Sequence, residues 1–244
     1  MKRNLVFNTL VAQEKINDGC KQSELFDYII SLGFKKIEVR REYFQDINME
    51  MKEIGKLAKD KNLDILYSVP DVIFLNGGNF NKSISDYLKE AEEMNASFIK
   101  LTIGDYKNKT QLKELEFINN KNINFTVEND QTNLSGKTHN ILKFLKDVKS
   151  RKININYTFD LGNFAYVNEN EEEAAKILNQ FVSYIHLKNV KKQHGDLLAT
   201  SLEKGTINWK KVLDILPKNV PIAIEYPSNN VEEILEDKKM IEES

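Results

Sequence analysis

Short apolar runs alternate with amphipathic stretches along the chain, and the alternation repeats roughly every 30 residues, the length of one βα unit. The apolar runs are rich in Ile, Val and Phe and are bounded by polar residues, which is typical of buried strands. Eight strands are predicted, at Asn4–Leu10, Lys35–Val39, Asp64–Val69, Phe98–Ile103, Asn124–Glu128, Ile155–Asp160, Val182–Leu187 and Pro221–Glu225.

The segments between these strands have the periodicity of amphipathic helices. Ser23 is a suitable N-cap for a helix that ends at Leu32, where Gly33 provides the stop. Met51 and Ile54 lie three residues apart, as on one face of a helix. Eight helices are predicted, at Ser23–Leu32, Asn48–Lys61, Ser83–Met94, Lys109–Asn120, Lys137–Lys149, Glu171–Phe181, Asn208–Leu216 and Val231–Ile241.

Strict alternation of eight strands with eight helices predicts an α/β fold, a (β/α)8 TIM barrel. No linker, repeat or low-complexity segment divides the sequence, so one domain over residues 1–244 is expected. A doubly wound open sheet is the alternative fold. However, no strand is followed by the GxGxxG or GxxxxGK[ST] loop that binds nucleotides in such sheets.

Composition excludes several classes of partner. The chain has 35 basic and 37 acidic residues and a net charge of −2. Its overall charge therefore does not attract nucleic acid or an anionic membrane. No apolar run approaches the ~18 residues of a membrane span, and the N-terminus lacks the features of a signal peptide. The single cysteine, Cys20, cannot form an internal disulfide, which favours a reducing, cytoplasmic location.

Four polar residues follow or end the last four predicted strands: Glu128, Asp160, His186 and Glu225. Burying a carboxylate costs several kcal/mol unless it is paired or coordinated, so four such residues at equivalent positions indicate a site. The active sites of these barrels form at the carboxyl ends of the strands. Three carboxylates and one imidazole are typical of a divalent cation site, with Mn²⁺, Mg²⁺ or Co²⁺ favoured before Zn²⁺.

Other polar residues lie near the same strand ends. Alternation along the second strand places Glu38 and Arg40 on one side and Arg41 on the other. An internal Glu38–Arg40 ion pair and a contact between arginine and substrate both remain open. An arginine would suit an anionic or polyhydroxyl end of the substrate. Asn129, which follows Glu128, and Lys188, which follows the seventh strand, are further candidates for binding substrate.

Six segments together carry a resemblance to a known family. They are LGFKKIEVRRE at 32–42, VEND at 127–130, FDLGN at 159–163, IHLKN at 185–189, INW at 207–209 and IEYP at 224–227. In order and spacing they resemble the xylose isomerase-like TIM barrels, also labelled sugar phosphate isomerase/epimerase or AP endonuclease family 2.

The resemblance implies roles for the four candidate ligands. In epimerases and isomerases of this group a Glu, an Asp, a His and a second Glu bind one metal, which matches Glu128, Asp160, His186 and Glu225. It also implies that the two glutamates act as an acid/base pair on opposite sides of the substrate carbon. The chain departs from the family at two positions: Asn163 stands where many members have His, and Asn189 where many have Asp.

The DNA-repair branch of the group uses several histidines for a trinuclear zinc cluster, and this chain has only three. His139 falls in a predicted helix, and His194 lies in a predicted loop after the seventh strand, from which it could reach the mouth of the site. Too few imidazoles and no basic excess therefore argue against incision of DNA.

The residues are consistent with proton transfer next to a carbonyl. A bound cation would polarise the carbonyl and stabilise an enediolate, while Glu128 and Glu225 would exchange the proton. The expected function is isomerisation or epimerisation of a sugar or sugar phosphate. Three alternatives remain: a lyase that dehydrates a cyclic polyol or keto-acid, a metal-dependent hydrolase or nuclease, and a barrel that binds a small molecule without turnover. The expected partner is a carbohydrate or polyol, and a homo-oligomer remains an option.

Overall fold

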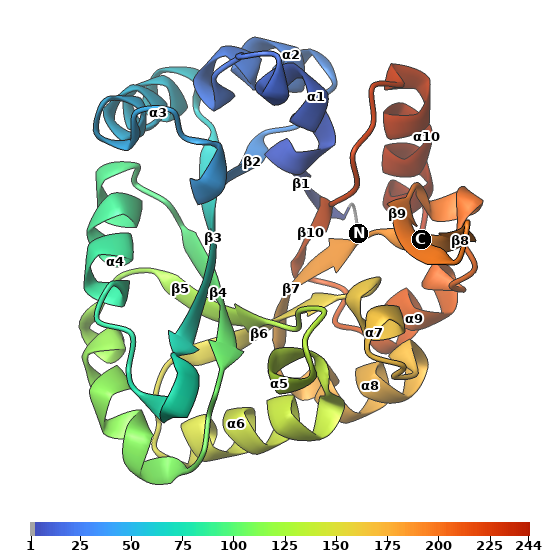
Figure 1. The fold of residues 1–244 in the computed structure, drawn as a ribbon. Coiled ribbons are helices and arrows are strands. Elements are labelled where there is room, and N and C mark those ends of the chain that lie inside the picture. The colour runs from blue at the N-terminus through green and yellow to red at the C-terminus, as the bar shows by residue number, and fades with distance from the viewer. Residues whose placement is uncertain (1–2) are drawn as a thin grey trace.

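Eight parallel strands close into a barrel in the computed structural model, which describes residues 3–244 (Figure 1). Around the barrel the order is β1-β10-β7-β6-β5-β4-β3-β2, and β1 pairs with both β10 and β2 to complete the ring. The predicted (β/α)8 TIM barrel is confirmed. The strands are β1 Asn4–Asn8, β2 Lys36–Arg40, β3 Asp64–Phe74, β4 Phe98–Gly104, β5 Asn124–Glu128, β6 Ile155–Asp160, β7 Val182–Leu187 and β10 Pro221–Ile224.

Helices surround the strands on the outside of the ring, as Figure 1 shows. The α-helices are α1 Gln13–Asn17, α2 Phe26–Ser31, α3 Ile47–Lys61, α4 Ile84–Glu93, α5 Asn133–Gly136, α6 Thr138–Ser150, α7 Asn163–Tyr166, α8 Glu171–Leu178, α9 Trp209–Ile215 and α10 Val231–Glu242. Short 3₁₀ segments are η1 Thr9–Ala12, η2 Gln22–Leu25, η3 Arg41–Tyr43, η4 Asn76–Gly78, η6 Asn179–Phe181 and η7 Leu202–Lys204. Within residues 3–244, no helix is long and apolar enough to span a membrane.

The segment between β4 and β5 differs from the prediction, because η5 (Lys109–Asn120) is a 3₁₀ helix and not an α-helix. Its buried residues are Leu112, Leu115 and Ile118, at strict intervals of three. Three residues per turn is the 3₁₀ repeat, so this geometry places all three side chains on one line facing the barrel.

Two apolar regions of very different size stabilise the barrel. The large one lies between the outward faces of the strands and the helices. The small one contains Val6, Leu66, Tyr184 and Ala223, with Phe98 packed against it. These five residues come from five different strands and meet inside the barrel. Because side chains alternate along a strand, the next inward positions are two residues further on, and they are polar. The interior is therefore apolar at one level and polar at the next, towards the carboxyl ends of the strands.

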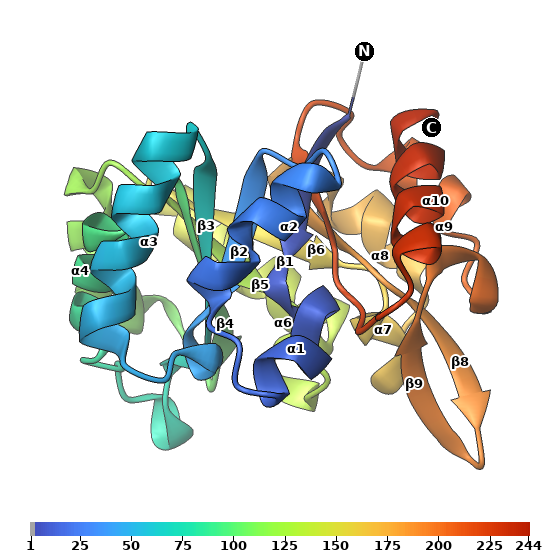
Figure 2. The same cartoon turned by 90° about the horizontal axis from the view of Figure 1, so that it is seen from above.

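A β-hairpin after β7 was not predicted. Strands β8 (Asn189–Gln193) and β9 (Asp196–Thr200) pair antiparallel and extend away from the barrel (Figure 2). The turn between them is His194–Gly195, and both residues have positive φ, of 53° and 98°. Two consecutive residues with positive φ are typical of the tight turns that join hairpin strands. The loop expected at this place is therefore an ordered hairpin.

Candidate metal centre

The four predicted ligands meet at one point in the structure. Glu128 ends β5, Asp160 ends β6, His186 lies on β7, and Glu225 directly follows β10. One potential ligand atom from each residue lies within 4.8 Å of those of the other three, and all four residues are buried. Neighbouring parallel strands bring their carboxyl ends to the same rim of a barrel, which is why residues so far apart in the sequence converge here.

Two buried atoms in this cluster have no hydrogen-bond partner. They are Nδ1 of His186 and Oε1 of Glu128, which lie 2.5 Å apart. Oε1 of Glu225 is 3.3 Å from the same nitrogen. Buried polar atoms are normally satisfied, and here they point towards a common centre. Carboxylate oxygens with one imidazole are suitable donors for a divalent cation, so the residues present fit such an ion.

Two buried lysines pair with the acidic ligands. Nζ of Lys188 lies 2.5 Å from Oδ2 of Asp160 and 2.9 Å from Oε2 of Glu225. Lys100, on β4, lies 2.5 Å from Oε2 of Glu128. Lys100 was not singled out in the sequence, although a lysine in the middle of an apolar strand was a signal that could have identified it.

Arg40 adds a third cation to the cluster. Its guanidinium donates to Oε1 of Glu225 at 2.8 Å and to Oε1 of Glu42 at 2.7 Å. The guanidinium therefore pairs with these two carboxylates. Glu38, on the same strand, bonds to other residues.

The neighbouring cations decide the ionisation of the glutamates. Burial alone would raise the pKa of Glu128, but the charges of Lys100 and His186 lower that pKa to about 2. Burial opposes ionisation of Glu225 as well, and Lys188 and His186 hold its pKa well below the usual range. Both glutamates are therefore ionised at neutral pH, as ligands and general bases must be.

Asp160 behaves differently from the two glutamates. Its burial, followed by the charges of Glu225 and Glu128, raises the pKa of Asp160 to about 8, although Lys188 acts in the opposite direction. A nearby cation favours the ionised form of a carboxylate, so a cation bound in the site would lower this pKa.

A cavity of about 420 Å³ opens over the cluster. Among the predicted substrate-binding residues, Arg40 and Lys188 line it. The full lining consists of Leu10, Arg40, Glu128, Asp130, Gln131, Thr132, Asp160, Asn163, Lys188 and Glu225. The size fits a small ligand, and the walls are polar.

Arg41 does not reach this cavity. Its guanidinium makes two hydrogen bonds of 2.9 Å to the carboxylate of Glu90 on α4, and the hydroxyl of Tyr67 donates to the same carboxylate. The two neighbours part because β2 ends at Arg40, which faces the interior, whereas Arg41 begins η3 and faces the helical layer. The position of Arg41 does not support the predicted contact with substrate.

Asn129 is fully buried behind Asp160 instead of facing the cavity. Its amide donates to the carbonyl of Asp160 at 2.8 Å, and its Oδ1 accepts from the backbone N–H of Asp160 at 2.9 Å and from the hydroxyl of Tyr157 at 2.6 Å. Asn129 therefore fixes the backbone that carries Asp160, and its predicted substrate contact is not supported by its position.

The two asparagines that depart from the family pattern make well-defined contacts. Nδ2 of Asn163 donates to Oδ2 of Asp160 and to the carbonyl of Asn129, both at 2.8 Å. Asn189 bonds to the backbone of Leu202 and Ile207, so it joins the start of β8 to the segment that follows the hairpin. Asn163 thus holds the side chain of the candidate ligand Asp160, whereas Asn189 holds the backbone of a neighbouring segment.

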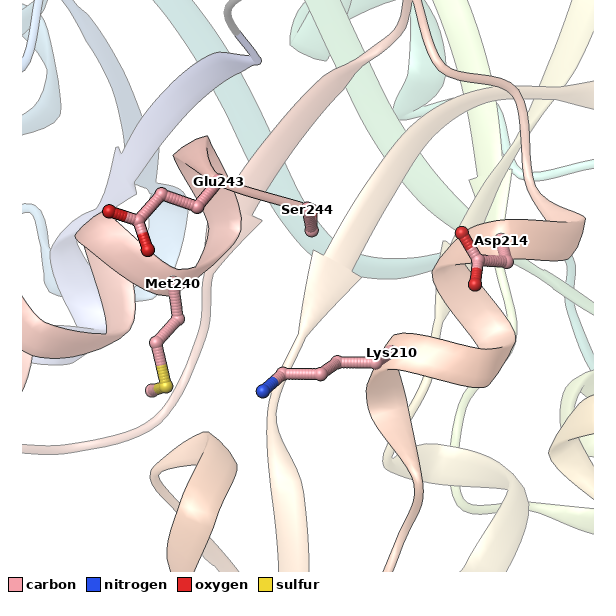
Figure 3. A pocket seen from close by; sticks show the side chains of 5 residues that line it. All are labelled: Lys210, Asp214, Met240, Glu243 and Ser244. Carbon is pink, nitrogen blue, oxygen red and sulfur yellow. The ribbon is translucent and has the colours of Figure 1, made fainter.

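The other two histidines lie away from the centre. His139 is exposed on α6, as expected, and His194 is exposed at the tip of the β8–β9 hairpin. Neither lines the cavity over the cluster. A separate hollow of about 360 Å³ lies between α9 and α10 and is lined by Lys210, Asp214, Met240, Glu243 and Ser244 (Figure 3). It contains none of the predicted site residues.

Comparison with known proteins decides the family. The family model described as xylose isomerase-like TIM barrel matches residues 26–244. The chain belongs to this family. No curated protein matches the sequence, and the similar solved structures have such low identity that they support only the fold.

Three of these structures cover nearly the whole chain. The probable 3-DHS dehydratase AsbF of Bacillus anthracis, involved in petrobactin synthesis, has 16% identity and a TM-score of 0.70, covering 99% of this chain and 98% of that one. A xylose isomerase-like TIM barrel protein of Mycobacterium smegmatis in complex with magnesium has 14% identity and a TM-score of 0.66, covering 99% and 95%. D-allulose 3-epimerase of Methylomonas sp. has 13% identity and a TM-score of 0.66, covering 93% and 85%. Zinc is bound in another matched structure.

Proposed function

We propose that this xylose isomerase-like barrel is a divalent-metal-dependent isomerase or epimerase of a sugar or sugar phosphate. The observation that carries the proposal is the convergence of Glu128, Asp160, His186 and Glu225 beneath a polar cavity. Two of these four residues are glutamates that the neighbouring cations keep ionised. The epimerase among the matched structures supports the same reaction class.

Each residue has a role that follows from its position. A divalent cation in this site would supply Lewis-acid polarisation of a substrate carbonyl and would stabilise an enediolate. Glu128 and Glu225 follow strands that are separated by β6 and β7 in the barrel order. Their carboxylates therefore approach a bound carbon from different directions, one to take a proton and the other to return it. Lys188, at the cavity wall, would donate hydrogen bonds to a substrate oxygen.

The oxygen-rich donor set favours Mn²⁺, Mg²⁺ or Co²⁺ before Zn²⁺. Magnesium and zinc are each found in a matched structure. We therefore propose Mn²⁺, Mg²⁺ or Co²⁺ as the bound ion on the basis of the donors in this chain.

A dehydratase is the second candidate, because the Bacillus anthracis dehydratase is among the matched structures. Both reactions begin with removal of a proton next to a carbonyl. They differ in the fate of the intermediate, since an epimerase returns a proton whereas a dehydratase expels a hydroxyl group as water. Mass analysis of the product distinguishes the two.

Two measurements test the proposal. Elemental analysis of protein purified without chelator, with a thermal shift on adding Mn²⁺, should reveal a bound divalent cation. In D₂O, the protein should incorporate deuterium into a member of a panel of ketoses, ketose phosphates and cyclic keto-acids, detected by NMR. Absence of metal uptake would contradict the metal-dependent part. A metal-loaded protein that exchanges no proton across the panel would favour a binding protein without turnover.

A further inference from the structure

The two ring nitrogens of His186 face different surroundings. Nδ1 points at the oxygens of Glu128 and Glu225 and has no hydrogen-bond partner. Nε2 lies 2.8 Å from Oε2 of Glu38. The imidazole is completely buried, so no solvent competes for either nitrogen.

Glu38 reaches His186 across the interior of the barrel. It lies on β2, and two strands, β10 and β1, separate β2 from β7 in the ring. The hydroxyl of Tyr184 donates to the same oxygen, Oε2, that contacts His186. The rings of Tyr184 and His186 pack edge to face with centroids 4.7 Å apart. Glu38 and Tyr184 thus surround the side of His186 that faces away from the other ligands.

Neither role considered for Glu38 from the sequence accounts for these contacts. The guanidinium of Arg40 pairs with Glu225 and Glu42, and these two pairs replace the expected ion pair with Glu38. Glu38 is completely buried and does not line the cavity, so it does not contact a substrate there. Burying a carboxylate this deeply costs free energy unless the carboxylate is paired and hydrogen-bonded. Its contacts with His186 and Tyr184 are therefore the ones that need explaining.

We infer that Glu38 is a positioning residue that orients His186 for the cation, an inference that rests on the proposed metal-dependent function. A carboxylate only accepts hydrogen bonds, so Nε2 of His186 donates its proton to Glu38. A cation displaces the proton of Nδ1 when it binds, and the lone pair of Nδ1 would then be directed at the space shared with Glu128 and Glu225. Tyr184 donates a second hydrogen bond to the same carboxylate oxygen and so fixes its position. Carboxylates that act on a metal through a histidine are a recognised device.

Metal affinity and the imidazole tautomer test this inference together. Glu38→Met removes the acceptor, and Glu38→Gln keeps an acceptor oxygen without charge. Calorimetry with Mg²⁺ on chelator-treated protein should give a dissociation constant roughly 10–100-fold higher for Glu38→Met, as for other partners of metal-bound histidines. Glu38→Gln should fall between Glu38→Met and the wild type. Glu90→Gln is a matched control, because Glu90 also accepts from a tyrosine hydroxyl but lies in the helical layer. It should bind Mg²⁺ like the wild type.

The tautomer gives a second readout that a merely structural role would not change. The chain has three histidines, so His139→Gln and His194→Gln assign the ¹⁵N imidazole spectrum. We expect His186 in the Mg²⁺-loaded protein to carry a proton on Nε2 that is protected from exchange with solvent by its hydrogen bond to Glu38, and we expect Glu38→Met to lose this protection.

Wild-type affinity in both Glu38 variants, or a proton on Nδ1 of the loaded protein, would overturn the inference. If Glu38→Met does not fold, Glu38→Gln carries the test alone. If the wild type binds no metal, the proposed function fails separately, and the metal-free spectrum decides the role of Glu38. If the Nε2 proton is protected from solvent exchange in the wild type but exchanges freely in Glu38→Gln, the positioning role of Glu38 is supported. Equal exchange in the two proteins rejects that role.

Discussion

The ammonium of Lys100 lies 2.5 Å from Oε2 of Glu128, with both side chains less than a tenth exposed. This pair joins Lys100 on β4 to one of the four residues of the candidate metal centre. It leaves Oε1 of Glu128 free to face His186. A buried ion pair of this kind contributes little when both partners are replaced, but removing one partner leaves an uncompensated charge.

Lys100→Met should therefore lower the free energy of unfolding by roughly 3–5 kcal/mol at neutral pH, the usual cost of breaking a buried pair. Chemical denaturation monitored by circular dichroism measures it. The double variant Lys100→Met/Glu128→Gln should recover most of the loss, because no charge then stays unpaired. Failure of the double variant to recover would indicate that lost packing dominates.

The same pair predicts a dependence on pH. The folded state lowers the pKa of Glu128 to about 2 from an ordinary value of 4.5. A lowered pKa means that the stabilisation is present above the ordinary value and is lost as the pH falls through the folded value. The difference in stability between wild type and Lys100→Met should therefore shrink between about pH 4.5 and pH 2. A difference that stays constant over this window would contradict the assignment.

Glu128→Gln and Glu225→Gln should each reduce deuterium exchange into the substrate by about 10²–10⁴-fold, the usual effect of losing a general acid or base. Glutamine keeps the shape and one oxygen ligand while removing the base. Metal content must be measured in parallel, since both residues are also proposed ligands. Full exchange by a metal-loaded variant would exclude that glutamate from proton transfer.

Arg40→Met and Arg41→Met should separate the two neighbouring arginines. Arg40 bonds to Glu225, so its loss should reduce kcat/KM by roughly 10–100-fold, matching the 1.5–3 kcal/mol of a hydrogen bond to a charged group. Arg41 pairs with Glu90 in the helical layer, so its loss should leave kcat/KM unchanged and lower stability by at most about 1 kcal/mol. A kinetic defect in Arg41→Met at unchanged stability would restore its predicted role in substrate binding.

Asn129→Ala should weaken metal binding by about 10–100-fold, because Asn129 holds the backbone that carries Asp160. Stability should fall by more than about 2 kcal/mol, because buried donors and acceptors lose their partners. Calorimetry with Mg²⁺ and chemical denaturation measure the two effects. Asn124→Ala, on the exposed start of the same strand, is the control and should change neither quantity much.

The sequence specified the eight barrel strands and the four candidate ligands because both depend on local patterns. A buried parallel strand needs a short apolar run, and a polar residue at its end stands out against it. In a parallel barrel the strand ends share one rim, so Glu128, Asp160, His186 and Glu225 could be grouped without knowing any distance. The alternation expected around the second predicted strand also separated Arg40 from Arg41.

Two other features could not be predicted from periodicity, because the same pattern of apolar residues is compatible with more than one local structure. Residues 109–120 have apolar positions that serve an α-helix or a 3₁₀ helix almost equally, and packing against the barrel favoured the latter. The β8–β9 hairpin is only partly buried and β8 consists mostly of polar residues, so its pattern resembled a loop. Its tight turn relies on the positive φ of His194, which residue type alone indicates poorly.

Only the closed tertiary structure determined which partners the buried charges have. The contacts of Glu38 with His186, Lys100 with Glu128 and Lys188 with Asp160 and Glu225 join strands that are distant in the sequence. The sequence by itself established that charged side chains would lie inside the barrel. Their pairing follows from ring closure and the stagger of the strands, which set the height of each side chain in the interior, and no local pattern encodes that height.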